Sequence, residues 1–411
     1  MSGWAQTRLR YVTDLNPPVR ADLLAALDTE LSFLPMDSIG ENGSLNLERT
    51  RPIAEVRNGY SYFEDGDVAF AKVTPCFENG KGALMQGLEN GAGFGTTEIT
   101  VLRPKTGTNA RYLRYIVQSE MFRQLGVGAM TGAGGLKRVP DDFTRDFKTD
   151  WPGAVDQERI ANFLDDKTAR IDALIAEKER LLSLLGESRE SVTELAVMPT
   201  DGTPLKPLKR VTLRIITGPF GSALHSSEYV EDGVPVINPS HIVGNSVCPD
   251  RNVSVTKEMA MSLSSYWLSP GELVVGRRGE MGRCAVVPLE GKGWLCGTGS
   301  LLATPDPPQV LPDYLQLVVS SRASKDWLSL ESVGSTMENL NGEILGRLPG
   351  FFPSISVQAD RLSRAHVALH THDELIKHVA EHIARLREYR SSLISAAVTG
   401  QLDVGAAEVA A

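Results

Sequence analysis

The sequence lacks an apolar run of the roughly 18 residues that a membrane-spanning helix needs, and its first residues, MSGWAQTRLR, lead into no apolar signal core. We therefore expect a cytoplasmic protein with no membrane contact. Cysteine is scarce, and the four cysteines form no CxxC pair, which argues against both a disulfide framework and a zinc knuckle. Buried or incidental thiols are the expected account of Cys76, Cys248, Cys284 and Cys296.

Positive charge is also in short supply. The 411 residues include 42 lysines and arginines against 51 aspartates and glutamates, a net charge of -9. Because contacts to phosphates need basic side chains, this balance by itself argues against a nucleic-acid partner. The balance is uneven, however, with 17 basic against 19 acidic residues in 1–155, 13 against 15 in 199–356, and 6 against 10 in 156–198. Local basic clusters outside the most acidic segment can therefore still contact DNA.

Motifs for nucleotide and cofactor chemistry are missing as well. The glycine-rich stretch GAMTGAGGLKRV (128–139) has neither the spacing of a phosphate-binding loop nor a GxGxxG pattern, so we predict a structural or target-contacting loop. Two near-matches to an adenine methyltransferase motif, NPPV (16–19) and DPPQ (306–309), lack the aromatic residue on which an extruded base stacks. We expect no catalytic residues and no cofactor bound by this chain itself.

A zinc site is not expected either. HVAEH (378–382) fits the HxxEH pattern of some zinc peptidases, but a catalytic zinc needs a third protein ligand, and few acids follow His382. The histidines of this region are better explained as one side of a solvated helix; they are His366, His370, His372, His378 and His382.

The sequence does contain an internal repeat with an offset of about 200 residues. YFEDGDVAFAK (62–72) corresponds to YWLSPGELVVGR (266–277), and SVTELAV (191–197) corresponds to SLISAAV (392–398). Single residues also match, among them Tyr112 with Tyr314, Pro152 with Pro353 and Gln157 with Gln358. The glycine-rich stretch aligns with STMENL (335–340), where its glycines and basic residues are replaced, so the two copies are expected to share a turn there rather than phosphate chemistry.

Each copy has the same plan. Short apolar runs such as DVAFAKV, ITVLRP, ELVVGRR and SLLATP predict strands, and RYLRYIVQSEMFRQL and DYLQLVVSSRASKDWL each predict a short helix. A long helix then follows in each copy. We expect an α+β protein with domains at 1–155 and 199–356, long helices at 156–198 and 357–403, and a tail at 404–411.

The long helices carry apolar stripes at alternating spacings of three and four residues, the pattern of a coiled-coil seam. The predicted seam of the first is Ile171, Leu174, Lys178, Leu181, Leu185, Ser188, Val192 and Leu195. The predicted seam of the second is Leu362, Ala365, Leu369, His372, Ile376, Val379, Ile383, Leu386, Arg390, Leu393 and Ala397. A helix of about 40 residues is roughly 60 Å long and cannot bury such a stripe alone. We predict that the two helices pack antiparallel, with the domains at opposite ends about an approximate two-fold axis.

This plan resembles the specificity subunit of type I DNA restriction-modification systems over nearly the whole chain. The resemblance is carried by GLKRVPDDF (135–143), DQERIANFLDDKTARIDALIAEKERLLSLLGESR (156–189), STMENLNGEILG (335–346) and REYRSSLISAAVTGQLDV (387–404). It implies two target-recognition domains that each read one half of a split DNA sequence, with the paired helices as the spacer. It also implies that two methyltransferase subunits dock on this protein and that a restriction subunit joins them, with S-adenosylmethionine, ATP and Mg²⁺ on those partners. One departure is the segment PGFFPSISVQADR, whose helical turns carry fewer acids than DQERIANFLDD, so docking there is expected to differ in detail.

Basic and polar residues after the predicted strands are the candidates for DNA contact, since long forked donors at a strand end can reach base edges or phosphates. Arg277 and Lys72 hold equivalent positions in the two copies. The full set is Lys72, Lys81, Lys137, Arg138, Ser240, His241, Arg277, Arg278 and Arg283. Solvated surface pairs and simple turn formation are the alternative readings of these residues.

A different class of function remains open from the residues alone. A coiled-coil adaptor that links two protein partners without recognising DNA would suit the acidic domains. DNA binding that weakens steeply with salt would distinguish the two hypotheses.

Overall fold

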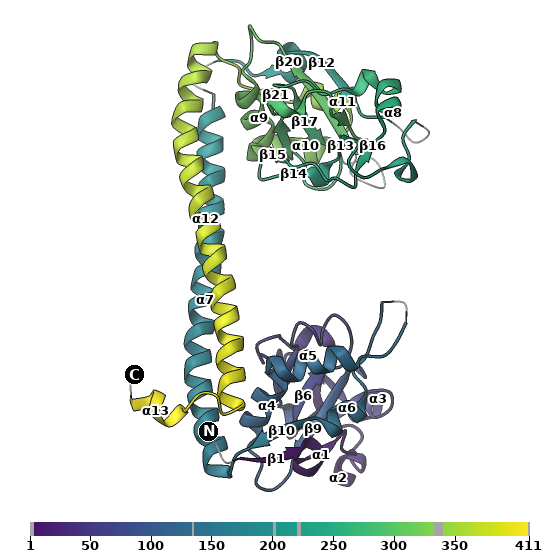
Figure 1. Cartoon of the computed structure of the whole chain (residues 1–411), viewed down its shortest axis with the longest axis vertical. Coiled ribbons are helices and arrows are strands. Elements are labelled where there is room, and N and C mark those ends of the chain that lie inside the picture. The colour runs from purple at the N-terminus through teal and green to yellow at the C-terminus, as the bar shows by residue number, and fades with distance from the viewer. Residues whose placement is uncertain (1–3, 134, 200–202, 220–222, 333–339, 410–411) are drawn as a thin grey trace. The chain divides into compact units, whose positions relative to one another are not determined.

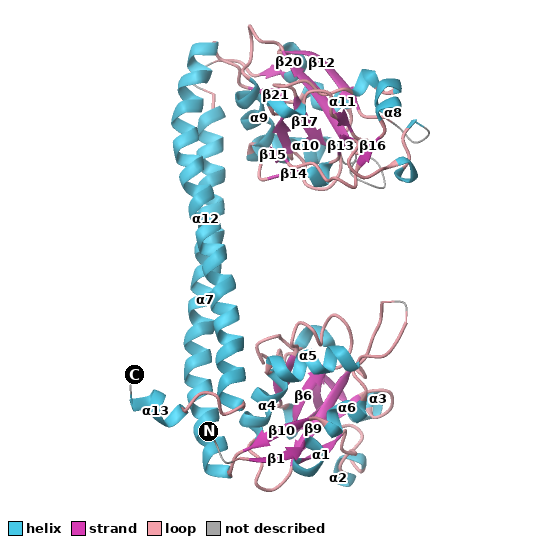
Figure 2. Cartoon of the chain, viewed as in Figure 1, coloured by secondary structure: helices cyan, strands magenta, loops and turns pink. Residues whose placement is uncertain are grey.

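The computed structural model describes residues 4–133, 135–199, 203–219, 223–332 and 340–409. The chain divides into two compact units, one of residues 1–179 with 381–411 and one of residues 180–380. Each unit combines a globular part of strands and short helices with stretches of the same two long helices (Figure 2). The predicted α+β class is confirmed.

The globular part of the first unit contains two four-stranded sheets. One is antiparallel throughout, in the order β2-β9-β6-β7, and the other has the order β4-β3-β8-β5, with β3 parallel to β8. A separate pair joins β1 to β10, the strand that leads into the first long helix. The strands are β1 Ala5–Arg8, β2 Thr13–Leu15, β3 Glu30–Leu34, β4 Thr50–Pro52, β5 Ser61–Glu64, β6 Val68–Ala71, β7 Gly82–Leu84, β8 Ala92–Gly95, β9 Ile99–Pro104 and β10 Lys148–Trp151. The short helices are α1 Leu9–Val12, α2 Ala21–Leu24, α3 Ile53–Val56, α4 Ala110–Gln118, α5 Glu120–Ala129, α6 Asp141–Asp146 and, after the long helices, α13 Val404–Val409.

The second unit repeats this architecture. Its antiparallel sheet has the order β12-β20-β17-β18, and its other sheet, β16-β13-β19, again contains one parallel pair, β13 with β19. The strands are β11 Lys206–Pro207, β12 Thr212–Thr217, β13 Val234–Ile237, β14 Ile242–Val243, β15 Ser246–Val247, β16 Ser254–Val255, β17 Leu273–Gly276, β18 Cys284–Val286, β19 Leu295–Cys296, β20 Ser300–Pro305 and β21 Pro349–Gly350. The short helices are α8 Lys257–Ser262, α9 Pro312–Ser320, α10 Arg322–Ser332 and α11 Gly342–Arg347. The predicted internal repeat is therefore present in the strand order itself.

The helical stretch after the last sheet strand differs from its prediction. Each copy forms two helices where one was expected, because the chain is extended at Ser119 and at Ser321. The Ser119 hydroxyl accepts a hydrogen bond from Phe122 N, and the Ser321 hydroxyl accepts one from Ser324 N. Serine at this position caps the following helix, which explains why the run breaks there.

The two long helices are α7 (Ala154–Val197) and α12 (Ile355–Val398), which lie side by side in each unit (Figure 1). In the first unit Arg390 of α12 pairs with Asp172 of α7, and Arg387 pairs with Glu179. In the second unit Arg189 of α7 pairs with Asp373 of α12. Residue numbers rise along one helix as they fall along the other, so the pairing is antiparallel as predicted. Helix α12 ends at Val398, and the predicted segment 357–403 takes in the turn that follows it.

The seam prediction is right for one helix and partly wrong for the other. Every predicted seam residue of α12 is buried or half-buried. In α7, however, Leu174, Leu181 and Leu195 are exposed, and neighbours such as Ile175 and Ala196 are buried instead. Pairs such as Leu174-Ile175 offer two apolar residues side by side, and spacing alone does not choose between them.

A buried glutamine in the first turns of each long helix joins that helix to its globular part. Gln157 accepts a hydrogen bond from Asn109 N at 2.8 Å and donates one to Pro152 O at 2.9 Å. Gln358 repeats this geometry, accepting from Leu311 N at 2.9 Å and donating to Pro353 O at 2.8 Å. The matched glutamines and prolines of the sequence repeat are thus structural anchors.

Replacing this anchor should loosen the first unit. In Gln157→Leu the apolar side chain leaves the Asn109 amide and the Pro152 carbonyl without their partner, which should lower the free energy of unfolding by about 2–4 kcal/mol. Urea unfolding measures this, with hydrogen exchange of the Asn109 amide as the local readout. Gln124→Leu is the control, because the exposed Gln124 amide donates to the Glu120 carboxylate and has no other hydrogen-bond partner among the described residues. Equal effects of the two substitutions would contradict an anchoring role.

Candidate nucleic-acid interface

The residue that directly follows β6 in the first unit, or β17 in the second, forms backbone hydrogen bonds with equivalent partners in both units. After β6, Lys72 N donates to Glu98 O at 2.8 Å, and Val139 N donates to Lys72 O at 2.8 Å. After β17, Arg277 N donates to Gly299 O at 2.9 Å, and Leu340 N donates to Arg277 O at 3.0 Å. The two predicted positions are therefore equivalent in the fold.

In the first unit the structure brings Lys72, Lys137 and Arg138 to this strand end. The Arg138 guanidinium donates two hydrogen bonds to the Glu98 carboxylate, at 2.8 and 2.7 Å. These bonds, and the charges of Arg138 and Lys72, hold the pKa of Glu98 below its usual value. Glu98 thus stays ionised at neutral pH, and the pair weakens only as the pH falls through that lowered pKa. A DNA phosphate would have to compete with Glu98 for Arg138.

Lys137 and Lys81 differ in their surroundings. The Lys137 side chain is exposed and has no hydrogen-bond or ion-pair partner among the described residues. Lys81 is half-buried, and its ammonium donates to Met36 O at 3.1 Å. Lys137 is therefore the more accessible of these two predicted contacts.

The glycine-rich stretch forms a turn, not a phosphate cradle. Arg138 N donates to Thr131 O at 2.8 Å, and Thr131 N donates to Arg138 O at 3.0 Å, so the stretch closes as a hairpin. Gly132 and Gly135 have positive φ, as such a turn requires. Gly134 and the matching residues 335–339 of the second copy lie outside the described residues.

Sequence reasoning missed two residues that hold this loop. The Thr74 hydroxyl donates to Gly135 O at 3.0 Å and accepts from Lys137 N at 2.9 Å. Glu98 fixes the Arg138 side chain, as described above. Both partners are distant in the sequence, so no local pattern points to them.

In the second unit the two adjacent arginines have different roles. Arg277 is 5% exposed, and its guanidinium donates to Leu340 O at 2.9 Å and to Thr298 O at 3.3 Å. Burial, followed by the charge of Arg278, lowers the pKa of Arg277. Arg278 is exposed, without a partner in the described part of the chain. Arg277 therefore stabilises the fold of the second unit, whereas the Arg278 side chain is accessible to an external partner.

The remaining candidates surround the turn Pro239–His241. Arg283 donates weakly to Pro239 O at 3.4 Å and pairs with Glu280 at 3.5 Å. Ser240 is exposed, whereas the His241 ring is buried, with Nδ1 3.2 Å from Asn238 N and 3.0 Å from Val236 O. The His241 imidazole thus stabilises its own turn, beside which Ser240 is exposed and Arg283 is half-buried.

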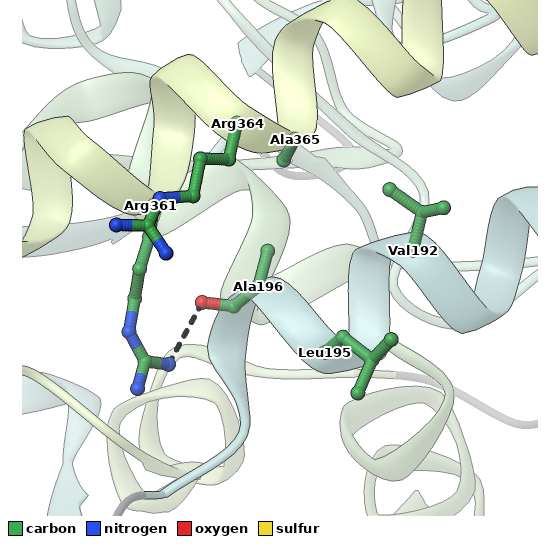
Figure 3. Close-up of a pocket in the computed structure, with 6 residues that line it drawn as sticks. All are labelled: Val192, Leu195, Ala196, Arg361, Arg364 and Ala365. Atoms are coloured by element: carbon green, nitrogen blue, oxygen red, sulfur yellow. Dashed lines mark hydrogen bonds between the residues drawn. The ribbon is translucent and has the colours of Figure 1, made fainter.

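A pocket of about 320 Å³ lies where α7 ends beside the start of α12 (Figure 3). Its walls are Val192, Leu195, Ala196 and Ala365, with Arg361 and Arg364. Arg361 donates to Ala196 O at 3.0 Å and to Met198 O at 2.7 Å, which satisfies carbonyls at the end of α7. We assign this arginine a helix-capping role.

Metal-ligand clusters and membrane-spanning helices are both absent from the described part of the chain. No group of three or more histidine, cysteine or acidic side chains within the described ranges is arranged to hold a metal ion. The helices described include none that is long and apolar enough to cross a membrane.

Two curated proteins share sequence with this chain. Over 260 residues, 62% of the chain, it is 31% identical to the type I restriction enzyme EcoEI specificity subunit of Escherichia coli. Over 216 residues, 52% of the chain, it is 36% identical to the type I restriction enzyme EcoAI specificity subunit of the same organism. The matched parts span only 42% and 36% of those relatives' own lengths. No protein-family model matches the chain.

Solved structures share the fold over nearly the whole chain. A chain from a structure of a type I R-M system matches with a TM-score of 0.68 and 18% identity, covering 97% of this chain and 98% of that one. The HsdS subunit from Thermoanaerobacter tengcongensis matches with a TM-score of 0.51 and 17% identity, covering 97% of each. The fold is thus that of restriction-modification S subunits. The resemblance to the specificity subunits of type I restriction-modification systems is confirmed, in sequence by the curated relatives and in fold by these structures.

The contrast between Arg277 and Arg278 can be tested without DNA. Arg277→Leu removes the donors that serve the buried Leu340 carbonyl and the half-buried Thr298 carbonyl, and we expect it to lower the stability of the second unit by about 2–3 kcal/mol. Arg278→Leu, the matched surface control, should change stability by less than about 0.5 kcal/mol. Thermal unfolding of the two variants measures the difference. Similar losses would show that Arg277 does not brace the framework.

Proposed function

We propose that this chain is the DNA-recognition subunit of a type I restriction-modification complex, with each globular part reading one half of a bipartite target. The observation that carries the proposal is the duplicated framework, in which equivalent strand ends present different side chains. The first unit has Lys72 and the Glu98–Arg138 pair at this strand end, whereas the second has the exposed Arg278 beside the buried Arg277. Two similar supports with unlike surfaces are what the recognition of two different half-sites requires.

Catalysis is assigned to partner subunits. In this proposal two methyltransferase subunits dock on the chain and methylate adenines in the bound target, and a restriction subunit joins them for cleavage. S-adenosylmethionine, ATP and Mg²⁺ would bind to those partners. The complex would act in the cytoplasm.

The acidic balance of the chain fits a shared DNA interface. Several candidate cations are already engaged, Arg138 by Glu98, Arg283 by Glu280 and Lys81 by a carbonyl. Because phosphate contacts supply most of the affinity for DNA, the isolated chain should bind weakly, and its partners should supply the missing contacts.

The long helices are proposed to set the gap between the half-sites. Helix α7 has 44 residues, which gives a length of about 66 Å at the usual rise. In a rigid antiparallel pair this length separates the two readers, so the spacing of the half-sites follows from geometry.

Reconstitution tests recognition directly. The chain, co-expressed with a type I methyltransferase subunit from the same genome, should co-purify with that subunit and bind DNA with an affinity that falls steeply with salt. The double variant Lys137→Ala/Arg278→Ala should reduce the salt slope by about 1 for each phosphate that the variant no longer neutralises. Arg170→Ala is the control, an exposed change on α7 that removes an ion pair with Asp166. Absence of DNA binding even with the methyltransferase present would favour the coiled-coil adaptor instead.

Lengthening both helices should widen the target. One extra heptad after Glu179 and one after Ala380 keep the seam in register and add about 10 Å, which corresponds to about 2–3 additional base pairs between the half-sites. Mapping methylated adenines in cells that carry the variant measures the gap, and the two half-site sequences should not change. A gap of unchanged length in an active complex would contradict the spacer role.

A further inference from the structure

The first unit contains a second, more polar pocket that none of the DNA-contact candidates lines. It has a volume of about 280 Å³ and lies where α4 and α5 meet the two long helices. Its lining includes the buried side chains of Ile175, Ile394 and Gln118, together with Arg123, Arg390 and the exposed Asn79. The pocket thus combines an apolar portion with amide and guanidinium groups, the mixture that small-molecule sites use to orient a ligand.

The Gln118 side chain is the first reason to expect a ligand. It is 8% exposed, and neither its amide nitrogen nor its amide oxygen has a hydrogen-bond partner among the described residues. Buried amides are nearly always paired, because an unpaired one loses its hydrogen bonds to water without replacement. Gln118 therefore offers both a donor and an acceptor to a molecule that enters the pocket.

The charge of the pocket is the second reason. Arg390 is neutralised by Asp172, and the exposed Arg387 by Glu179. Arg123 forms no ion pair in the described part of the chain; its terminal nitrogen donates only to the Ser391 hydroxyl at 3.2 Å, and its buried Nε has no partner there. Arg123 is thus a half-buried cation that forms no ion pair among the described residues, and the exposed Glu41 is the carboxylate that also lines the pocket. A planar guanidinium suits an oxyanion.

The corresponding pocket of the second unit lacks both features. It lies beside the repeat-related pair Arg189–Asp373 and has a volume of about 330 Å³. Its glutamine, Gln316, is fully used, accepting from Val286 N and donating to Asn245 O. Asp313 lines it, together with Arg189 and Asp373, which neutralise each other. The two pockets therefore differ in their unpaired groups: only the first has an unpaired buried amide among the described residues, and Lys325, which matches Arg123, is already paired with Glu280.

We propose that the pocket of the first unit binds a small phosphate-bearing ligand, with the phosphate at Arg123 and a polar edge of the ligand at the Gln118 amide. A nucleobase has such an edge, since a glutamine amide pairs with the donor and acceptor of adenine. The ligand would touch α4, α5 and both long helices, so its binding would hold the first reader against the helix pair.

Calorimetric titration of the full-length chain with inorganic phosphate, adenosine and adenosine monophosphate tests the proposal. The monophosphate should bind more tightly than either fragment, because it alone engages both groups. Arg123→Gln should weaken its binding about tenfold or more, the effect expected for loss of a charge-assisted hydrogen bond. Gln118→Leu should weaken binding of the monophosphate and of adenosine but leave that of phosphate unchanged.

Lys325→Gln is the matched control. Lys325 holds the position of Arg123 in the second copy, where it pairs with Glu280, and its loss should not affect binding. If inorganic phosphate binds as tightly as the monophosphate, the result would support the contact at Arg123 and contradict the contact at Gln118. No binding of any probe, binding that Arg123→Gln leaves unchanged, or displacement of the monophosphate by duplex DNA would overturn the proposal.

Discussion

A single 44-residue helix with one apolar stripe cannot bury that stripe against itself, so it needs a second element to pack against. The rest of the structure depends on this constraint. The chain supplies the second helix itself, from the other copy of its repeat. Antiparallel pairing places the end of one helix beside the start of the other, so each unit needs both copies to complete its core. In the second unit Ala196 and Val197 from the end of α7 and Ala365 from α12 belong to the same buried cluster as the sheet residues. The stability of each unit therefore depends on residues from both copies of the repeat.

The anchors of the globular parts follow from the same arrangement. Gln157 and Gln358 stand in the first helical turns and bind backbone groups of the loop before the helix and of the loop that leads into α4 or α9. Because these partners are backbone atoms, the surface side chains around them can change without disturbing the junction. A framework held through its main chain can therefore carry unlike recognition surfaces, which is the property that a reader of two different half-sites needs.

The strands, the repeat and the antiparallel helices could be predicted from the sequence because each leaves a recognisable pattern, such as the short apolar run ITVLRP that forms β9. The register of the α7 seam could not, since Leu174 and Ile175 both satisfy the pattern and only packing against α12 separates them. The break at Ser119 was also missed, because serine is tolerated in a helix and acts as a cap only when its hydroxyl faces the next turn. Among the site residues, Arg277 and Arg278 look alike in the sequence. Their difference comes from the Leu340 carbonyl, 63 residues away.

The difference between the buried Arg277 and the exposed Arg278 shows how recognition residues can be sought in a duplicated protein. Matching the two copies identifies equivalent positions, such as Lys72 and Arg277. The buried residue of this pair, Arg277, binds backbone carbonyls of its own unit and is not accessible to a target. The accessible cations lie near the equivalent positions and not at them: Lys137 stands two residues before Val139, and Arg278 directly follows Arg277. In the repeat alignment their counterparts are Glu338 and Val73, so neither cation is shared by the two copies. Under the proposed function, the shared backbone contacts would define where a target approaches, and the unshared exposed side chains beside them would decide which target is accepted. Specificity in this fold should therefore be sought at positions where the copies differ and the side chain has no partner within its own unit.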